Sequence, residues 1–416
     1  MWDKLLDRFL RGFVVSGRLS VTFPDGTCRD YGQDSQLSAR IQIHDTQTIR
    51  ALSLNPELAL GEAYMDERVT LQNTTLDDLM RLLIRSRENG IMPAWLTAAD
   101  RIRLHLRRFL QKNAPGTARR NVAHHYDISD DLYRLFLDED MQYSCAYFTD
   151  PDMSLEAAQA AKKAHIAAKL RLEPGMRVLD MGCGWGGMAL TLARDHGVEV
   201  TGITLSENQL SRARTRATET GLSDRVHFHL KDYRHIKGPF DRVVSVGMFE
   251  HVGLPNYDTY FRCVADLLAP DGIALIHTIG RSAPPIPTSP WITKYIFPGG
   301  YVPSLSDVAL PIERAGLWQA DIEVWRLHYA HTIRHWRARF DAKIDQVEAM
   351  YDPRFVRMFR YYLTICIMAF EEQMQGVYQF QLARRNDSVP LTRDYILGLT
   401  HPLRTELKHQ RPEPAE

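Results

Sequence analysis

The stretch from Arg177 to Gly187, with the sequence RVLDMGCGWGG, constrains the fold of this chain more than any other. Its first residues resemble the end of a short apolar strand, and residues 188–194 have the spacing of a helix. An acid at the end of a strand, followed by alternating glycines and a helix amino terminus, forms a tight turn where backbone approaches a ligand closely. Such a turn lies at the ligand-binding edge of an open α/β sheet.

Beyond this turn, strand-like and helix-like segments alternate. We expect strands at 198–204, 226–230, 241–246 and 273–278, and helices that start near Ser206, Pro255 and Ser306. Alternation at this spacing predicts an α/β fold with a parallel, doubly wound sheet. Two further helices are expected at 131–137 and 154–172, and the long aromatic pattern at 355–384 is predicted to be one helix packed on the core.

The residues that follow the strands indicate which ligand the sheet binds. A nicotinamide enzyme usually has Asp or Glu after its second strand, and a phosphate loop ends in Lys and Ser or Thr. This chain has neither feature. An acid and an aromatic ring after the third strand suit adenine, so the pattern predicts an S-adenosylmethionine site without a pyrophosphate to hold. The predicted donor-binding residues so far are Asp180, Gly182, Gly184, Thr204, Gln209, Asp232 and Tyr233.

Residues 1–90 form a small unit of mixed α and β character in this interpretation. Segments 17–22 and 39–43 alternate like strands, with a turn signal at 24–27, and segments 46–60 and 76–86 have helical spacing. No catalytic chemistry is visible in it. We expect a packing, substrate-presenting or dimerisation domain.

A basic amphipathic helix is predicted at 98–112. Its apolar face carries Ile102, Leu106, Phe109 and Leu110, and its basic residues are Arg101, Arg103, Arg107, Arg108 and Lys112. It is either a linker helix with a solvated basic side or a surface helix attracted to anionic lipid, at about 1 kcal/mol per basic residue. The break at 113–117 then divides the chain into domains at 1–115 and 116–416.

Composition excludes several classes of function. Lys and Arg together number 51, as do Asp and Glu, so there is no general attraction to nucleic acid. Five scattered cysteines without metal-ligand spacing favour a reducing compartment and argue against a metal site, and His124 and His125 lack a second ligand pair. No apolar run approaches the roughly 20 residues of a spanning helix, and no cleavable signal is visible, so we expect a cytoplasmic protein.

Several unlinked motifs then occur in order. They are Tyr143-Ser144-Cys145, the segment 247–253 (GMFEHVG), the segment 277–280 (HTIG), the segment 297–301 (FPGGY) and His328-Tyr329. Together with the glycine turn they resemble the cyclopropane-fatty-acyl-phospholipid synthase family over roughly residues 115–390. The amino-terminal unit is similar to the extra domain of the longer bacterial members.

The resemblance implies a Rossmann-like class I methyltransferase sheet with helical insertions and a small polar nest that binds bicarbonate beside S-adenosylmethionine. The family positions of the nest fall on Cys145, Glu250, His277, Ile279 (through its backbone) and Tyr329, and Tyr143 and Ser144 are expected to close over the methionine part. The implied reaction methylates a cis double bond of a phospholipid-bound acyl chain, and bicarbonate accepts a proton from the resulting carbocation as the ring closes. Segment 291–301 is expected to line the acyl channel.

Other interpretations remain at this point. A family member that makes a methyl-branched or otherwise C-methylated chain would use the same nest. A small-molecule methyltransferase with a polar acceptor and a non-catalytic lipid-binding protein are further hypotheses. Taken singly, Cys145 is typical of a small packed core residue, and for His277 and Tyr329 a hydrogen-bonded core position is the alternative to a role in the site. With a lipid substrate, the protein is expected to touch the inner membrane surface peripherally, and a homodimer is possible.

Overall fold

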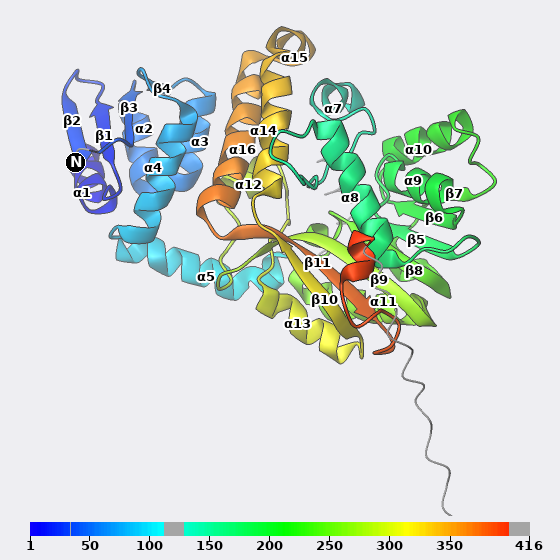
Figure 1. Ribbon diagram of the computed structural model, residues 1–416. Coiled ribbons are helices and arrows are strands. Elements are labelled where there is room, and N and C mark those ends of the chain that lie inside the picture. The colour runs from blue at the N-terminus through cyan, green and yellow to red at the C-terminus, as the bar shows by residue number, and fades with distance from the viewer. Residues whose placement is uncertain (34, 112–128, 399–416) are drawn as a thin grey trace, which may run out of the picture.

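The computed structural model describes residues 1–33, 35–111 and 129–398 (Figure 1). Its amino-terminal part is a four-stranded sheet in the order β2-β1-β3-β4, covered by helices. The elements are α1 (Trp2–Phe13), β1 (Arg18–Thr22), β2 (Cys28–Gly32), β3 (Ser38–Ile43), α2 (Thr46–Leu54), α3 (Pro56–Met65), β4 (Val69–Leu71), α4 (Leu76–Asn89) and α5 (Ala94–Leu110). The helical pattern at 46–60 is broken, because Pro56 begins a new helix and offers no N–H to continue the first.

The larger part is built on a seven-stranded sheet in the order β10-β11-β9-β8-β5-β6-β7. Its strands are β5 (Arg177–Met181), β6 (Glu199–Thr204), β7 (Val226–Leu230), β8 (Phe240–Val246), β9 (Leu268–Arg281), β10 (Trp318–Trp325) and β11 (Gln375–Ala383). Strands β5 to β9 pair in parallel, as predicted, whereas β10 and β11 are antiparallel additions. The strand order reverses between β5 and β8, and ligands bind at such a point.

Helices flank this sheet and extend from it toward the amino-terminal part. They are α7 (Asp130–Phe136), α8 (Leu155–Leu170), α9 (Gly187–His196), α10 (Glu207–Glu219), α11 (Tyr257–Leu267), α12 (Pro290–Tyr295), α13 (Leu305–Arg314), α14 (His328–Asp341), α15 (Ile344–Met350) and α16 (Pro353–Glu372). Short 3-10 turns are η1 (Tyr233–His235), η2 (Phe249–His251), η3 (Leu254–Asn256) and η4 (Asp394–Leu397). The predicted Rossmann-like α/β fold is therefore present.

The prediction of one helix over 355–384 is wrong. Helix α16 ends at Glu372, Met374 adopts a left-handed conformation with φ 55°, and β11 follows. Strand β11 is buried on both faces, and its residues 378–382 (YQFQL) alternate apolar and polar side chains. This alternation covers only five residues directly after the long aromatic pattern of α16, so the whole stretch resembles one helix in the sequence.

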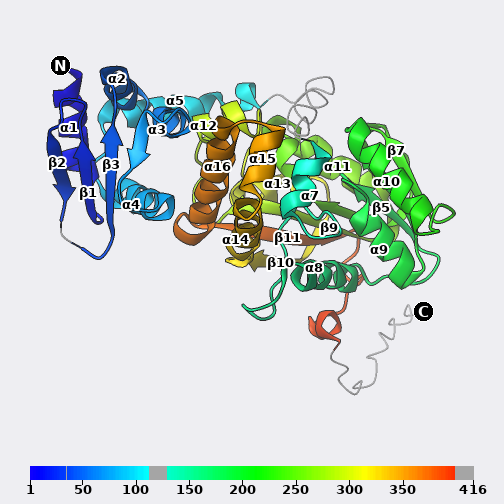
Figure 2. The same cartoon turned by 90° about the horizontal axis from the view of Figure 1, so that it is seen from above.

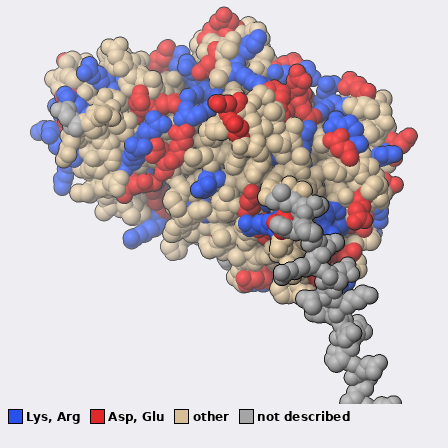
Figure 3. Space-filling model, in the orientation of Figure 1, with Lys and Arg blue, Asp and Glu red and all other residues tan. Residues whose placement is uncertain are grey.

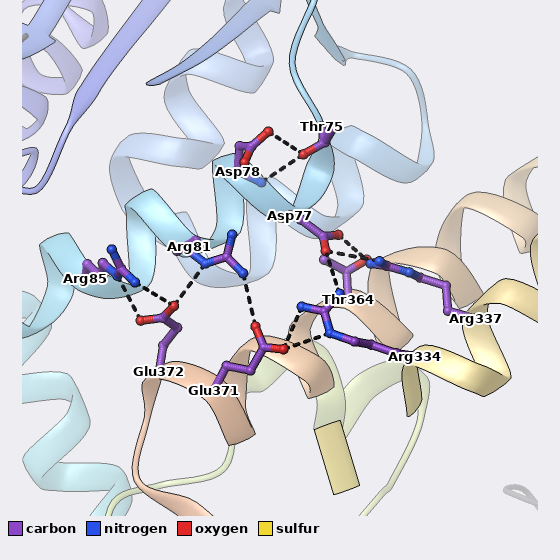
Figure 4. A network of polar contacts seen from close by, with 10 residues as sticks. All are labelled: Thr75, Asp77, Asp78, Arg81, Arg85, Arg334, Arg337, Thr364, Glu371 and Glu372. Atoms are coloured by element: carbon purple, nitrogen blue, oxygen red, sulfur yellow. Dashed lines mark hydrogen bonds and ion pairs between the residues drawn. The ribbon is translucent and has the colours of Figure 1, made fainter. Parts of the chain in front are cut away.

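Helices α14 and α16 lie between the amino-terminal part and the large sheet in both views of the ribbon (Figures 1 and 2). A network of ion pairs links α4 to these two helices (Figure 4). Glu371 accepts from Arg81 at 3.0 Å and from Arg334 at 2.6 Å, while Glu372 accepts from Arg81 and Arg85. Glu371 therefore bonds one arginine from each part of the chain, Arg81 and Arg334. Such charge-assisted bonds require a defined orientation of the two parts.

A close apolar contact supports the same interface. Gly61 of α3 lies against Trp291 of α12, and a Cβ at Gly61 would sit 2.4 Å from the indole ring. Only glycine leaves enough space for this approach. The expected domain boundary at 113–117, like His124 and His125, lies outside the described residues.

The surface carries both signs of charge. Figure 3 shows Lys and Arg interspersed with Asp and Glu on the visible face. In helix α5, Ile102 and Leu106 of the expected apolar face are 59% and 45% exposed. No helix among the described residues is both long enough and apolar enough to cross a membrane.

Candidate active site

The glycine turn opens a cavity of about 150 Å³ at the carboxyl edge of the sheet. Gly182 has φ 80°, and a Cβ there would come within 2.8 Å of Met248. Gly184 has φ 53° and would meet no atom, so its backbone faces open space. Every predicted donor-binding residue lines this cavity: Tyr143, Ser144, Asp180, Gly182, Gly184, Thr204, Gln209, Asp232 and Tyr233.

Asp180 is the buried acid of this cavity. It is only 2% exposed, and its Oδ2 atom has no hydrogen-bond partner among the described residues. Burial raises the pKa of Asp180 to about 7, although the charge of Lys162 lowers it somewhat. A carboxylate in this state favours a bound cation, because a positive partner restores the ionised form.

The other polar residues of the cavity are held by local bonds. Thr204 donates to Gln209 Oε1 at 2.8 Å, where Ser206 caps the amino terminus of α10. Asp232 accepts from the guanidinium of Arg234 at both carboxylate oxygens, at 2.7 and 2.6 Å. Burial alone would raise the pKa of Asp232, but these bonds offset it and the net pKa is lowered. Asp232 is therefore anionic and already paired with Arg234 on one side.

The loop that carries Tyr143 and Ser144 is tied down by helix α8. The buried Lys162 ammonium donates to Gln142 Oε1 at 2.6 Å and to Ser144 Oγ at 2.8 Å. Gln159 donates to the carbonyl of Ser144 at 2.9 Å. Burial lowers the pKa of Lys162 to about 8. These contacts make the loop a fixed wall, and Lys162 contributes positive charge beneath it.

A second cavity of about 410 Å³ adjoins the first and is lined largely by apolar and aromatic side chains. All five residues of the expected nest line it: Cys145, Glu250, His277, Ile279 and Tyr329. Five residues of segment 291–301, including Trp291 and Phe297, line it as well. The structure thus brings together residues that are up to 184 positions apart in the chain, from Cys145 to Tyr329.

Glu250 bonds to the sheet rather than to the nest histidine. Its Oε1 accepts the backbone N–H of Ile279 at 2.7 Å, and its Oε2 is buried without a partner among the described residues. Burial raises the pKa of Glu250 to about 7, against the lowering effect of the Ile279 bond. The Ile279 N–H is therefore occupied, and no hydrogen bond joins Glu250 to His277 among the described residues.

His277 is oriented by Gln379 of the neighbouring strand β11. Gln379 Nε2 donates to His277 Nδ1 at 3.1 Å, so the ring proton resides on Nε2. Burial holds the pKa of His277 well below its ordinary value, and the charges of Lys162 and Lys169 add to this. His277 is thus a neutral imidazole with one N–H to donate.

Cys145 and Tyr329 are neutral as well. Burial raises the pKa of the Cys145 thiol and of the Tyr329 phenol. The thiol donates to the carbonyl of Ala146 at 3.3 Å, and the Tyr329 ring packs against Phe370 and Trp336. The nest therefore presents neutral donors and no thiolate or phenolate nucleophile.

Four residues line both cavities: Tyr143, Ser144, Gly247 and His251. Tyr143 also bonds Tyr362 through the two hydroxyls, at 2.9 Å, and stacks on Trp336. The two cavities therefore share a wall at the end of β8.

Sequence reasoning missed several residues of the site. Gln142 and Lys162 gave no signal, because a lone polar residue in a helix or loop is normally solvated. Gln379 falls within the single helix predicted at 355–384, and a helix there gives no indication of its contact with His277. His251 follows Glu250 in the GMFEHVG motif and was the one detectable omission. Within the described residues, no group of three or more His, Cys, Asp or Glu side chains is arranged to hold a metal ion.

Comparison with known proteins identifies the family. The model of the mycolic acid cyclopropane synthetase family matches residues 113–380, and a domain of unknown function matches residues 5–92. A cyclopropane-fatty-acyl-phospholipid synthase of Escherichia coli is 39% identical over 346 residues, covering 83% of this chain and 88% of that protein. A probable fatty acid methyltransferase of Pseudomonas putida is 36% identical over 367 residues, covering 85% and 89%.

Among solved structures, the mycolic acid cyclopropane synthase CmaA1 in complex with SAH and CTAB is similar with a TM-score of 0.61 and 35% identity. The match covers 64% of this chain and 98% of that one. This chain belongs to the mycolic acid cyclopropane synthetase family and is an S-adenosylmethionine-dependent methyltransferase.

Proposed function

We propose that this member of the family adds a methylene unit from S-adenosylmethionine across a cis double bond of a phospholipid-bound unsaturated acyl chain, forming a cyclopropane ring. The shared wall of Tyr143, Ser144, Gly247 and His251 carries the proposal. The cavity at the glycine turn, with Asp180, Thr204 and Gln209 in its lining, suits the methyl donor, and the apolar cavity on the other side of the wall suits an acyl chain.

The donor cavity fits S-adenosylmethionine. When bound, this molecule supplies an electrophilic sulfonium methyl group, which an unactivated alkene requires because it is a weak nucleophile. The unpartnered Oδ2 of Asp180 is suited to the ammonium of the methionine part. Thr204, Gln209, Asp232 and Tyr233 would hold the adenosine, and Tyr143 and Ser144 would cover the methionine.

The nest fits an oxyanion such as bicarbonate. His277 Nε2–H and the Tyr329 hydroxyl are neutral donors on the wall of the acyl cavity, and Glu250 Oε2 is buried without a partner among the described residues. Bound bicarbonate would supply a general base in a site that excludes water. The neutral state of Cys145, His277 and Tyr329 also protects them, because a thiolate or phenolate there would itself be methylated.

Two finer parts of this proposal concern the membrane and the assembly. Helix α5 exposes Ile102 and Leu106, and its arginines would attract an anionic bilayer. We infer a peripheral contact with the inner membrane surface through this helix, and a homodimer through the amino-terminal part remains a prediction. Replacing Arg101 with Gln should reduce co-sedimentation with anionic vesicles and leave binding to neutral vesicles unchanged.

One experiment tests the main proposal. The purified protein is incubated with S-adenosylmethionine and vesicles of a monounsaturated phospholipid, and the lipids are analysed by mass spectrometry and proton NMR. We expect a gain of one CH₂ per acyl chain and the upfield resonances of a cyclopropane ring. Lipid binding without any mass gain would instead support a non-catalytic lipid-binding protein and contradict the proposal.

The same assay separates the alternatives. A methylene- or methyl-branched product would show olefinic or branch-methyl resonances in place of the ring, and the Pseudomonas putida relative carries the name of a fatty acid methyltransferase. A polar small-molecule acceptor is disfavoured by the apolar lining of the second cavity, including Trp291, Phe297 and Phe370. Methylation of a water-soluble acceptor in preference to lipid would reverse that judgement.

A further inference from the structure

Arg281 is a buried cation on the wall of the acyl cavity. It is the last residue of β9, and alternation along the strand places His277, Ile279 and Arg281 on one face. All three line the cavity. At a rise of about 3.3 Å per residue, Arg281 lies about 13 Å along the strand from His277. A positive charge therefore stands on the same wall as the nest, at a fixed separation from it.

The guanidinium of Arg281 has few partners. Its Nη1 donates to the carbonyl of Gln373 at 3.4 Å, and its Nε is buried without a partner among the described residues. The side chain is only 8% exposed, and no carboxylate among the described residues forms an ion pair with it. Burial lowers the pKa of Arg281, against a raising effect of Tyr301, and the positive charge of Arg87 lowers it as well. A buried cation without a counter-charge is unfavourable, so the site favours an anion.

The amino-terminal part adds to this positive region. Arg87 of α4 pairs with Glu57 at 3.3 Å and with Asp100 at 3.2 Å, and Arg103 pairs with the same Asp100 at 3.4 Å. These four residues line the cavity together with Arg281. Arg87 and Arg103 are thus paired with carboxylates, whereas Arg281 has no ion pair among the described residues. The remaining carboxyl group of the cavity, Glu250, bonds the backbone N–H of Ile279 instead.

Apolar walls continue on the amino-terminal side of this charged group. Leu10, Phe13, Leu19 and Ile43 belong to the core of the amino-terminal part and line the same cavity. The catalytic part contributes Phe297 and other aromatic residues. The cavity therefore offers apolar surface from both parts of the chain around one unneutralised cation, which suits a lipid with an anionic group next to its acyl chains.

We propose that Arg281 binds an oxyanion carried by the acyl lipid and thereby determines which double bond reaches the nest. A guanidinium recognises phosphodiester or carboxylate oxygens through paired, charge-assisted hydrogen bonds. When the anionic group of the lipid is bound at Arg281, the distance from Arg281 to His277 along β9 sets how many carbon atoms lie between that group and the reacting double bond. The inference rests on the proposed lipid substrate and adds to it a residue for anchoring and positional selection.

The test compares Arg281→Gln and Arg281→Lys with Arg385→Gln, a control arginine paired with Asp387 on the surface. Binding of short-chain, monomeric phospholipid, free fatty acid and diacylglycerol is measured by tryptophan fluorescence, since Trp291 lines the cavity. Thermal unfolding confirms that each variant is folded. Because binding is read without turnover, the result does not depend on ring formation.

We expect Arg281→Gln to weaken phospholipid binding about tenfold or more and to leave diacylglycerol binding unchanged. Arg281→Lys should retain most of the affinity. A loss confined to the free fatty acid would support the same oxyanion site with a carboxylate as the bound group. Equal losses for all three lipids, or no loss for either anionic lipid, would overturn the inference.

A second measurement addresses positional selection. With a phospholipid whose acyl chain has two cis double bonds, the wild type should modify mainly one of them, and Arg281→Gln should modify both. An unchanged ratio of positional products in Arg281→Gln would contradict the positional role. Lipid binding that depends on Arg281, without any methylated product from the wild type, would refute the proposed reaction and leave the anion site in place.

Discussion

Gln379 donates its side-chain amide to Nδ1 of His277 across two neighbouring antiparallel strands, at 3.1 Å. Gln379 is fully buried, and its Oε1 has no partner among the described residues, so the amide serves His277 alone. An acceptor at Nδ1 requires the proton on Nε2. The contact therefore decides that His277 offers the acyl cavity a donor rather than a lone pair.

This relationship predicts the effect of Gln379→Glu. A carboxylate accepts from Nδ1–H, which moves the ring proton and removes the Nε2–H donor. Turnover should fall about 100-fold, while affinity for S-adenosylhomocysteine stays the same. Nitrogen-15 NMR of the histidine ring reports the tautomer directly. Gln381→Glu is the matched control, since Gln381 is buried on the same strand but bonds Lys169 and Tyr395 away from the cavity.

Glu250→Gln tests the nest without disturbing the donor cavity. The amide keeps the bond from the Ile279 N–H through its oxygen but has no proton to exchange. We expect turnover to fall at least about 100-fold and calorimetric affinity for S-adenosylhomocysteine to change little. Similar losses of affinity and rate would show that Glu250 shapes the donor cavity instead.

The raised pKa of Asp180 predicts that replacing this residue stabilises the ligand-free protein and weakens ligand binding. Burial raises its pKa from the ordinary 3.8 to about 7. Because the folded pKa is the higher one, its contribution to stability is complete below about pH 4 and is lost as the pH rises through about 7. Asp180→Asn should therefore stabilise the ligand-free protein at pH 8, on the order of 4 kcal/mol, but not at pH 4.

Urea denaturation at the two pH values measures this difference, and calorimetry should show weaker binding of S-adenosylmethionine by Asp180→Asn. Asp195→Asn is the control. Arg194 lowers the pKa of Asp195, so its contribution has the opposite sign and appears above the unfolded pKa. A stability gain that is equal at both pH values would contradict the titration of Asp180.

Gly61→Ala should destabilise the contact between the amino-terminal part and the catalytic part of the chain. The new methyl group would lie 2.4 Å from the Trp291 indole, which has no room to move because it is fully buried. We expect a loss of about 1–3 kcal/mol in the free energy of unfolding. Gly12→Ala provides the contrast, since its nearest neighbour is 3.7 Å away and alanine favours a helix by about 1 kcal/mol. Equal effects of the two changes would contradict the close contact.

Glu371→Gln should weaken the link between α4 and α16 shown in Figure 4. It removes the charge that accepts from both Arg81 and Arg334. These side chains are partly exposed, so the expected loss is only about 1–2 kcal/mol. The loss should shrink in high salt. Asp387→Asn, at an exposed pair with Arg385, should have no measurable effect on unfolding.

Much of the fold followed from local patterns. The parallel strands β6, β7 and β8 appeared within one residue of their predicted bounds, because apolar alternation, glycine turns and caps such as Ser206 act between near neighbours. The same holds for the residues around the glycine turn, since the motif itself places Asp180, Gly182 and Gly184 at one edge of the sheet. Strand β11 escaped prediction because its short alternating segment, residues 378–382, directly continues the aromatic pattern of α16.

The chain's sequence by itself determined the type of sheet, the edge where ligands bind and, through its motifs, the residues grouped at the donor cavity and the nest. Only the tertiary structure decided that Gln379 orients His277, that Lys162 supports Ser144, and that Arg281 faces the acyl cavity without a counter-charge. Local spacing acts over a few residues, whereas burial, tautomer and charge balance depend on side chains that meet only when distant segments pack together.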